Sequence, residues 1–309
     1  MMMASIDTRS GAATLFSLPR QTSESFPKGL GAARPLPPTG STTASAITTP
    51  THCLSTPCTT TFRRAWPRAP NVKNVGAEVM KIGVGEALGL GKADYYVIIN
   101  MDGFKSFINA LGGITLNVNY RIPMGGKTSE NIPPKEWIEP GPNQHMNGRY
   151  ALWYARGRYH VKGADYSRME RQRCVINAVV QQAKPEVVLA NFEKIASAST
   201  KTISTDIPRS KLPALIDLAM KVKGTNLHSV VFQPGVVGWV SANPPWAAVQ
   251  RRVQQALKEA DKAESHKTAT ASASPSATES TSAKPTKKST TAGKTDDLSD
   301  SCAYHPVKD

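Results

Sequence analysis

The order of elements between residues 93 and 119 constrains the fold most strongly. "ADYYVIIN" (93–100) is a short, apolar, β-rich run, which is typical of a buried strand. "GFKSFINALG" follows as a helix that Asp102 can cap and that ends at Gly112. "GITLNVN" (113–119) alternates apolar and polar residues and therefore indicates another strand. Strand, helix and strand in this order predict a layered α/β domain.

The sequence before this unit contains a hairpin and a helix. "MMMASID" and "ATLFSLP" read as two strands, and "TRSG" supplies turn residues that end at Gly11. The hairpin ends at Pro19–Arg20. Residues 76–90 carry a helix-like apolar pattern, weakened by their glycines. We therefore expect ordered structure on both sides of residues 21–70, which are rich in Thr, Ser and Pro and predict a loop without regular structure.

The sequence after residue 120 is more helical. Residues 121–147 read as loop because of their prolines, and Asn147 can cap a short helix, "NGRYALWYA". A longer helix is predicted from Asp165 to about Ala183. Further helices are predicted near 186–199 and 208–222, a strand over 226–233, and an amphipathic helix over 244–263 with Trp246, Val249, Val253 and Leu257 on one side.

Composition divides the chain into one domain and a tail. Residues 264–309 are a low-complexity Ser/Thr/Ala/Pro/Lys sequence that cannot bury enough apolar surface to fold. We therefore predict a single domain over residues 1–263 and a disordered tail over 264–309. Cys53, Cys58, Cys174 and Cys302 show no metal-ligand spacing, and their positions give no support for a disulfide framework.

The net charge narrows the class of partner. The chain has 38 Lys and Arg residues against 23 Asp and Glu residues, which gives a formal net charge of +15. Such an excess attracts nucleic acid, an anionic lipid surface or phosphorylated substrates. No apolar run approaches the roughly 20 residues that span a bilayer, and "MMMASIDTRSG" lacks the layout of a signal peptide. As written, the chain is expected to be cytoplasmic.

The segment "YARGRYHVKGADYSRMERQR" (154–173) concentrates arginines beside an aspartate. Arg168, Arg171 and Gln172 are spaced i, i+3, i+4 and share one helix face. Asp165 can cap that helix. The N-terminus of the helix favours anions and would point at Arg156 and Arg158, which are two residues apart. Guanidinium forks suit phosphate, so the segment indicates either an anion pocket or a solvated basic helix end. Nucleic acid is disfavoured because no recognition helix, zinc module or aromatic platform accompanies the cluster.

Three blocks in this order resemble the LytR-CpsA-Psr family: "DYYVIINMDGFKSFINALGGITLNV", "GPNQHMNGRYALWYARGR" and "DYSRMERQR". The hairpin "SIDTRSGAATLFSLPR" matches a further family element. The resemblance implies an α/β/α fold with a central, mostly mixed sheet and a hydrophobic lipid groove. It also implies a membrane-anchored, extracytoplasmic phosphotransferase that moves a glycopolymer from a polyprenyl-pyrophosphate carrier to peptidoglycan. Such proteins have also been described as transcriptional attenuators, for which this sequence gives no physical reason.

The resemblance assigns roles residue by residue. It implies that Arg156 and Arg158 are catalytic and that Asp165 is their acidic partner. It implies Mg²⁺ as the cofactor of the family, held by aspartates of upstream "GxD" and "RxDT" segments, which would precede Met1; we therefore expect no metal ligand in this sequence. The predicted pyrophosphate-binding residues are Arg20, Arg168, Arg171 and Gln172.

The Thr-rich stretch, like the missing upstream segments, departs from the family pattern. We hypothesise that residues 36–62 are translated out of frame, because shifting "TGSTTAS" (39–45) by one nucleotide permits "DGFYDCI" and the family has a helix near this point. If so, the core lacks a helix, and the chain is expected to fold poorly and to be inactive as written. A non-catalytic polyprenyl-phosphate-binding protein and, with less support, a nucleic-acid-binding attenuator are the alternatives. The coding DNA tests the frame.

Overall fold

The structure is a computed structural model of the 309-residue chain. It describes residues 1–19, 22, 74–161, 163–184, 203–271 and 295–306. The out-of-frame hypothesis for 36–62 and the helix predicted near 186–199 lie outside these residues.

A four-stranded mixed sheet forms the centre of the fold, with strand order β1-β2-β9-β10. β1 (Met2–Ile6) and β2 (Ala13–Ser17) pair antiparallel, which confirms the predicted hairpin. β2 pairs parallel with β9 (Leu227–Val231), so the strand predicted over 226–233 is also confirmed. β9 pairs antiparallel with the short β10 (Asp296–Asp297).

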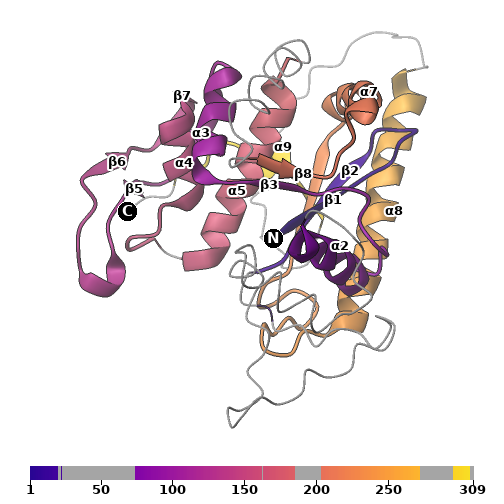
Figure 1. The fold of residues 1–309 in the computed structure, drawn as a ribbon, viewed down its shortest axis with the longest axis horizontal. Coiled ribbons are helices and arrows are strands. Elements are labelled where there is room, and N and C mark those ends of the chain that lie inside the picture. The colour runs from indigo at the N-terminus through magenta and orange to yellow at the C-terminus, as the bar shows by residue number, and fades with distance from the viewer. Residues whose placement is uncertain (20–21, 23–73, 162, 185–202, 272–294, 307–309) are drawn as a thin grey trace, which may run out of the picture.

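Helices cover both faces of this sheet because its inner strands are apolar on both sides. β2 is buried along its whole length, and successive side chains point to opposite faces. Phe16 packs in a core with α2 and α8, whereas Leu15 packs in a core with α5 and α7. The sheet therefore lies between two helical layers (Figure 1), which confirms the predicted α/β fold. The helices are α2 (Val75–Ala87), α5 (Ala164–Gln182), α7 (Leu212–Lys223) and α8 (Trp246–Ala271).

A further hydrophobic core lies on the other side of α5 (Figure 1). β4 (Ile114–Val118) buries alternate residues as predicted and pairs antiparallel with β7 (Gly141–Met146). β5 (Ile122–Met124) pairs with β6 (Glu136–Ile138). The prediction that residues 121–147 are loop is therefore wrong, because strands this short and interrupted by proline show no usable alternation. Within the described residues, 3₁₀ helices form at η2 (Thr128–Glu130) and η3 (Arg209–Lys211).

The helix predicted after Asp102 forms as α3 (Met101–Ala110), but its cap is Asn100. The Asn100 side chain accepts a hydrogen bond from the Gly103 backbone N at 2.8 Å. Asp102 lies inside the first turn, where its side chain is 76% exposed and pairs with Lys105 at 2.8 Å. The predicted cap was therefore two residues too late, since Asn and Asp are both good caps and the sequence does not choose between them.

The cap prediction holds at the start of α4 (Gly148–Arg156) and fails at the start of α5. α4 begins after Asn147, which accepts hydrogen bonds from backbone N–H groups of the first turn, so this predicted cap is confirmed. α5 begins after Gly163, whose φ of 78° is left-handed, and no side chain caps it. Asp165 lies inside the first turn of α5. The prediction that Asp165 caps the helix is wrong, because its carboxylate is turned toward two arginines instead.

β3 (Val97–Ile99) pairs antiparallel with β8 (Ile203–Thr205) in a separate two-stranded sheet. The strand predicted over 93–100 therefore exists, but it is not buried. Val97 is 63% exposed and Ile99 is 38% exposed. An apolar run identifies a strand without saying which of its faces another layer covers, so the predicted burial was wrong.

A partly buried ion pair joins this two-stranded sheet to α2. Lys81 Nζ lies 2.5 Å from Asp206 Oδ2, and only 7% of the Lys81 side chain is exposed. Asp206 Oδ1 also accepts a hydrogen bond from the Tyr96 backbone N at 2.8 Å. Burial alone would raise the pKa of Asp206, but the hydrogen bonds from Lys81 and Tyr96 lower it below its ordinary value of 3.8.

The C-terminal segment is ordered where the structure describes it. α8 runs to Ala271, and residues 295–306 contain β10 and α9 (Leu298–Ser301). Leu298 is fully buried in the core beneath the sheet. The prediction of a disordered tail over 264–309 is therefore wrong for these residues. Composition averaged over the tail concealed a single buried leucine and the strand pairing beside it.

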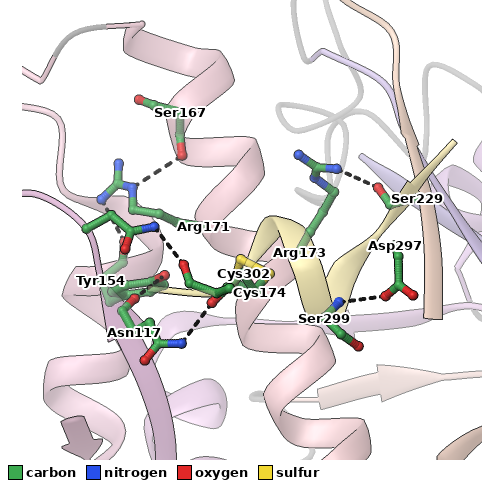
Figure 2. Close-up of a disulfide and its surroundings, with 12 residues drawn as sticks. Asn117, Tyr154, Ser167, Arg171, Arg173, Cys174, Ser229, Asp297, Ser299 and Cys302 are labelled. Atoms are coloured by element: carbon green, nitrogen blue, oxygen red, sulfur yellow. Dashed lines mark hydrogen bonds between the residues drawn. A yellow bond between two sulfur atoms is a disulfide. The ribbon is translucent and has the colours of Figure 1, made fainter. Parts of the chain in front are cut away.

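A disulfide between Cys174 of α5 and Cys302 ties this segment to the centre of the fold (Figure 2). The Asn117 side chain donates to the Cys302 backbone O at 3.0 Å, and Asn119 holds the next residue in the same way. The sequence offered no support for a disulfide framework, yet this pair is bonded, since a separation of 128 residues carries no sequence signal.

No helix within the described ranges is long and apolar enough to cross a membrane.

Loss of the disulfide is expected to destabilise the domain. Because the cross-link closes a loop with a separation of 128 residues, Cys302→Ser should lower the free energy of unfolding by about 2–5 kcal/mol. Urea denaturation of Cys302→Ser, Cys174→Ser and the double variant measures this. All three should be equally destabilised, and unfolding curves that match the wild-type curve would show that the bond does not form.

Asp206→Asn should lower the free energy of unfolding at pH 7 by about 1–3 kcal/mol, because it leaves buried Lys81 without its closest carboxylate. The lowered pKa of Asp206 contributes stability above pH 3.8 that is lost as the pH falls through the folded-state pKa. The difference between wild type and variant should therefore be constant from pH 7 to about pH 4 and shrink in more acidic solution. A difference that instead grows toward acid pH would contradict the assignment.

Candidate functional site

The candidate site is built where α4 ends and α5 begins. α4 packs closely on α3, since a Cβ on Gly148 would meet the Lys105 backbone O at 2.1 Å. The Gly148 backbone N also donates to Asn109 Oδ1 at 2.7 Å. These two contacts fix the start of α4, so its C-terminal end, at Arg156, points in a defined direction from the core.

Arg156 and Arg158 are both exposed at this end of α4. The Arg156 guanidinium carbon lies 5.1 Å from the centre of the Trp153 ring, a cation–π geometry, and its Nη1 contacts Met101 Sδ. Gly157 separates the two arginines. A Cβ on Gly157 would meet the Pro123 backbone O at 2.5 Å, so only glycine fits between them.

Asp165 joins Arg158 to Arg168. One oxygen, Oδ1, lies 2.6 Å from Arg158 Nη2 and 2.7 Å from Arg168 Nη2. The Arg168 side chain is only 7% exposed, whereas that of Arg158 is 47% exposed. Arg168 Nε is buried and has no hydrogen-bond partner within the described part of the chain. A single carboxylate therefore faces two cations, and an unpaired buried donor lies beside it.

Arg171 and Gln172 lie on the same helix but are oriented toward the protein. Arg171 is 3% exposed, and its Nη1 and Nη2 donate to the backbone O atoms of Tyr154 at 2.7 Å and Gly157 at 2.6 Å. Gln172 Nε2 donates to the Ala155 backbone O at 3.3 Å. Burial lowers the pKa of the Arg171 guanidinium. Sequence spacing predicted that Arg171 and Gln172 share a helix face, but it did not predict that their side chains donate to backbone carbonyls.

The structure thus brings most of the predicted site together. Arg156, Arg158, Asp165 and Arg168 lie around the junction of α4 and α5, and Arg171 and Gln172 lie behind it. Arg20 lies outside the described residues. The assignment of the arginines and Gln172 to a pyrophosphate stays a prediction, as does the hydrophobic lipid groove.

An apolar row beside Arg156 was not expected as part of the site. Val97, Ile99 and Met101 are 63%, 38% and 53% exposed, and Met101 contacts Arg156 directly. The signal that could have revealed this row is the apolar run that ends at Ile99, just before Asn100 and Met101. Because the run was interpreted as a buried strand, its exposed face was missed.

The donor set does not fit a divalent cation. Mg²⁺ is held by carboxylates and other oxygen donors, and the carboxylate at this junction, Asp165, already pairs with two arginines. Over the described stretches, no three His, Cys, Asp or Glu residues gather in a way that could hold a metal. The site as described is therefore an arrangement of guanidinium groups and backbone, suited to an anion.

The model of the LytR_cpsA_psr family matches residues 1–262, which is most of the chain and includes this site. The chain belongs to the LytR_cpsA_psr family. The resemblance seen in "YALWYARGR" and "DYSRMERQR" is thereby confirmed over a longer stretch than those motifs occupy.

Two relatives of known sequence are similar to this chain. One is the polyisoprenyl-teichoic acid–peptidoglycan teichoic acid transferase TagU of Enterococcus faecalis, which is 34% identical over 171 residues. That match covers 53% of this chain and 52% of TagU. The other is biofilm regulatory protein A of Streptococcus mutans, which is 32% identical over 158 residues, covering 50% of this chain and 38% of that protein. The chain thus spans about half or less of these relatives. The crystal structure of Bacillus subtilis TagV has a similar fold, with a TM-score of 0.51 and 22% identity over 84% of this chain and 87% of that chain.

Asp165→Asn should lower the free energy of unfolding by about 1–2 kcal/mol, because buried Arg168 loses its carboxylate partner. Asp102→Asn is the matched control, since Asp102 also lies in the first turn of a helix but forms only an exposed pair, with Lys105. The control should change stability by less than about 0.5 kcal/mol. Equal effects of the two substitutions in urea denaturation would show that the Asp165 pairs contribute nothing of their own.

Proposed function

We propose that the arginines at the junction of α4 and α5 bind the diphosphate of a polyprenyl-diphosphate-linked glycopolymer. The protein would belong to a phosphotransferase reaction that moves this glycopolymer to peptidoglycan. The observation that carries the proposal is the pairing of Arg158 and Arg168 with one Asp165 oxygen at this junction, with the buried Arg168 Nε unpaired within the described residues. Arg156 lies exposed in the last turn of α4, two residues before Arg158. The relatives named as teichoic acid transferases support it.

The chemistry of the reaction fits such a site. A hydroxyl oxygen of the acceptor would attack the phosphorus that carries the glycopolymer, and the bond from that phosphorus to the bridging oxygen would break. Polyprenyl phosphate would leave, and the hydroxyl proton would pass to solvent. Negative charge accumulates on the phosphate oxygens in such a displacement, so fixed guanidinium groups stabilise it. Arg156 and Arg158 are exposed enough to reach a ligand, and Arg168 is held behind them.

The apolar row supports a ligand that is part anion and part hydrocarbon. Met101 and Val97 are more than half exposed, and Met101 touches Arg156. A diphosphate at the arginines would leave the first isoprene units of its lipid beside this row, where burial of apolar surface contributes roughly 25 cal/mol per Å². Free inorganic pyrophosphate would gain only the charged contacts.

One feature of the site favours binding of this ligand without turnover. The carboxylate at the junction, Asp165, pairs with two arginines and is therefore not free to hold Mg²⁺. A non-catalytic polyprenyl-phosphate-binding protein is thus the second candidate. A transfer assay with a lipid-linked glycopolymer and peptidoglycan separates the two candidates, because only a catalyst releases polyprenyl phosphate.

Calorimetric titration with inorganic pyrophosphate and with farnesyl diphosphate tests the binding. Arg156→Ala and Arg158→Ala should each weaken binding of both ligands about tenfold, which is the effect of losing one charge-assisted contact. Farnesyl diphosphate should bind more tightly than pyrophosphate because of the apolar row.

Arg251→Ala is the matched control, because Arg251 is an exposed arginine on α8, outside the site. It should leave both affinities unchanged within about twofold. Binding of a DNA duplex that falls steeply with salt and is abolished in Arg156→Ala would instead support the nucleic-acid alternative. Equal loss of diphosphate affinity in all three variants would remove the proposed site and leave only a general effect of net charge.

A further inference from the structure

The C-terminal end of α4 requires hydrogen-bond donors. The last carbonyl groups of a helix have no partner within the helix, and a buried carbonyl without one is costly. Tyr154 and Ala155 belong to this last turn and are both buried. Gly157, just beyond the helix, is buried as well and packs against the Pro123 backbone. Water therefore does not readily satisfy these groups, and the chain must supply donors itself.

α5 supplies these donors from two consecutive residues. Arg171 spans the turn, with Nη1 2.7 Å from the Tyr154 backbone O and Nη2 2.6 Å from the Gly157 backbone O. Gln172 Nε2 donates to the Ala155 backbone O, between them, at 3.3 Å. The three bonded carbonyls therefore lie on both sides of Arg156 and immediately before Arg158.

The fork shape of the guanidinium makes this arrangement specific. A planar guanidinium carries donors on separate nitrogens, so it can reach two carbonyls on either side of a helix end at once. An ammonium group has a single nitrogen and cannot do so. Arg171 Nε points back to the Ser167 backbone O at 3.3 Å, so each nitrogen of the group faces a carbonyl. With 3% of the residue exposed, little of the guanidinium is accessible to a ligand in solution.

We infer that Arg171, with Gln172, is a positioning residue that holds the backbone on either side of Arg156 and before Arg158, instead of contacting the diphosphate itself. Only the identity of the ligand rests on the proposed function. The clamp, defined here as the hydrogen bonds from Arg171 and Gln172 to residues 154, 155 and 157, is a property of the chain without ligand.

A matched control is present on the same helix. Arg173 is also buried, with 6% exposed, and its Nη1 donates to Ser229 Oγ of the sheet at 2.6 Å. Figure 2 shows Arg171 and Arg173 directed to opposite sides of α5. Arg173→Lys therefore removes a buried guanidinium from the same helix without touching the end of α4.

The experiment compares Arg171→Lys, Gln172→Ala and Arg173→Lys by amide hydrogen exchange and by titration with inorganic pyrophosphate. Arg171→Lys should speed exchange of the backbone amides of residues 155–160 about tenfold, the effect of losing one net hydrogen bond. Gln172→Ala should produce a smaller change in the same amides. Arg173→Lys should leave them as in the wild type. The affinity for pyrophosphate should fall about tenfold in Arg171→Lys and stay within twofold in Arg173→Lys.

The outcomes separate the inference from the proposed function. Lost pyrophosphate affinity with unchanged exchange at 155–160 would overturn the inference and make Arg171 a direct ligand. Equal acceleration of exchange at 155–160 in Arg171→Lys and Arg173→Lys would overturn it as well. If the wild-type protein binds no pyrophosphate, the proposed function fails, and the exchange rates still decide the clamp. If Arg171→Lys does not fold, Gln172→Ala carries the same comparison.

Discussion

The packing of α5 between two hydrophobic cores is the constraint on which the rest of the structure depends. Cys174, Val175 and Ala178 face the core built by β4, β5 and α4, whereas Ile176 and Val180 face the core beneath the central sheet. A helix buried on two sides has little freedom to rotate or slide, because either movement would open voids in both cores. The polar groups that α5 carries are therefore held at fixed positions, which an electrostatic site requires.

Buried arginines on such a helix must find partners on whichever side they point. Arg171 finds backbone carbonyls of α4, and Arg173 finds a serine of β9. Each guanidinium thus links α5 to a different neighbour. The disulfide at Cys174 links α5 to the C-terminal segment (Figure 2). The same short sequence, "RQRC", therefore connects the two cores and the end of the chain.

The sequence predicted elements well where one physical signal was dominant. The hairpin, the alternation of β4, the Asn147 cap and the apolar face of α8 all depend on local chemistry that a short window contains. The exposure of β3, the strands between the prolines and the order of the C-terminal segment were missed because each depends on contacts that a short window does not contain. Such contacts are the pairing of β5 with β6 and of Cys174 with Cys302. Within the site, helical spacing correctly placed Arg168, Arg171 and Gln172 near one another, but it could not say which donors turn inward.

The inward turn of Arg171 resolves an electrostatic conflict in the site. The C-terminal end of a helix carries roughly half a negative charge on its unpaired carbonyls, so it opposes the binding of an anion beside it. Arg156 lies in the last turn of α4, where that opposition is greatest. Donors from Arg171 and Gln172 bond to the carbonyls of Tyr154, Ala155 and Gly157, which offsets part of their negative charge and adds a buried cation behind the helix end. With the first turn of α5 beside Arg158, a helix end that would repel a diphosphate becomes part of a site that can attract one.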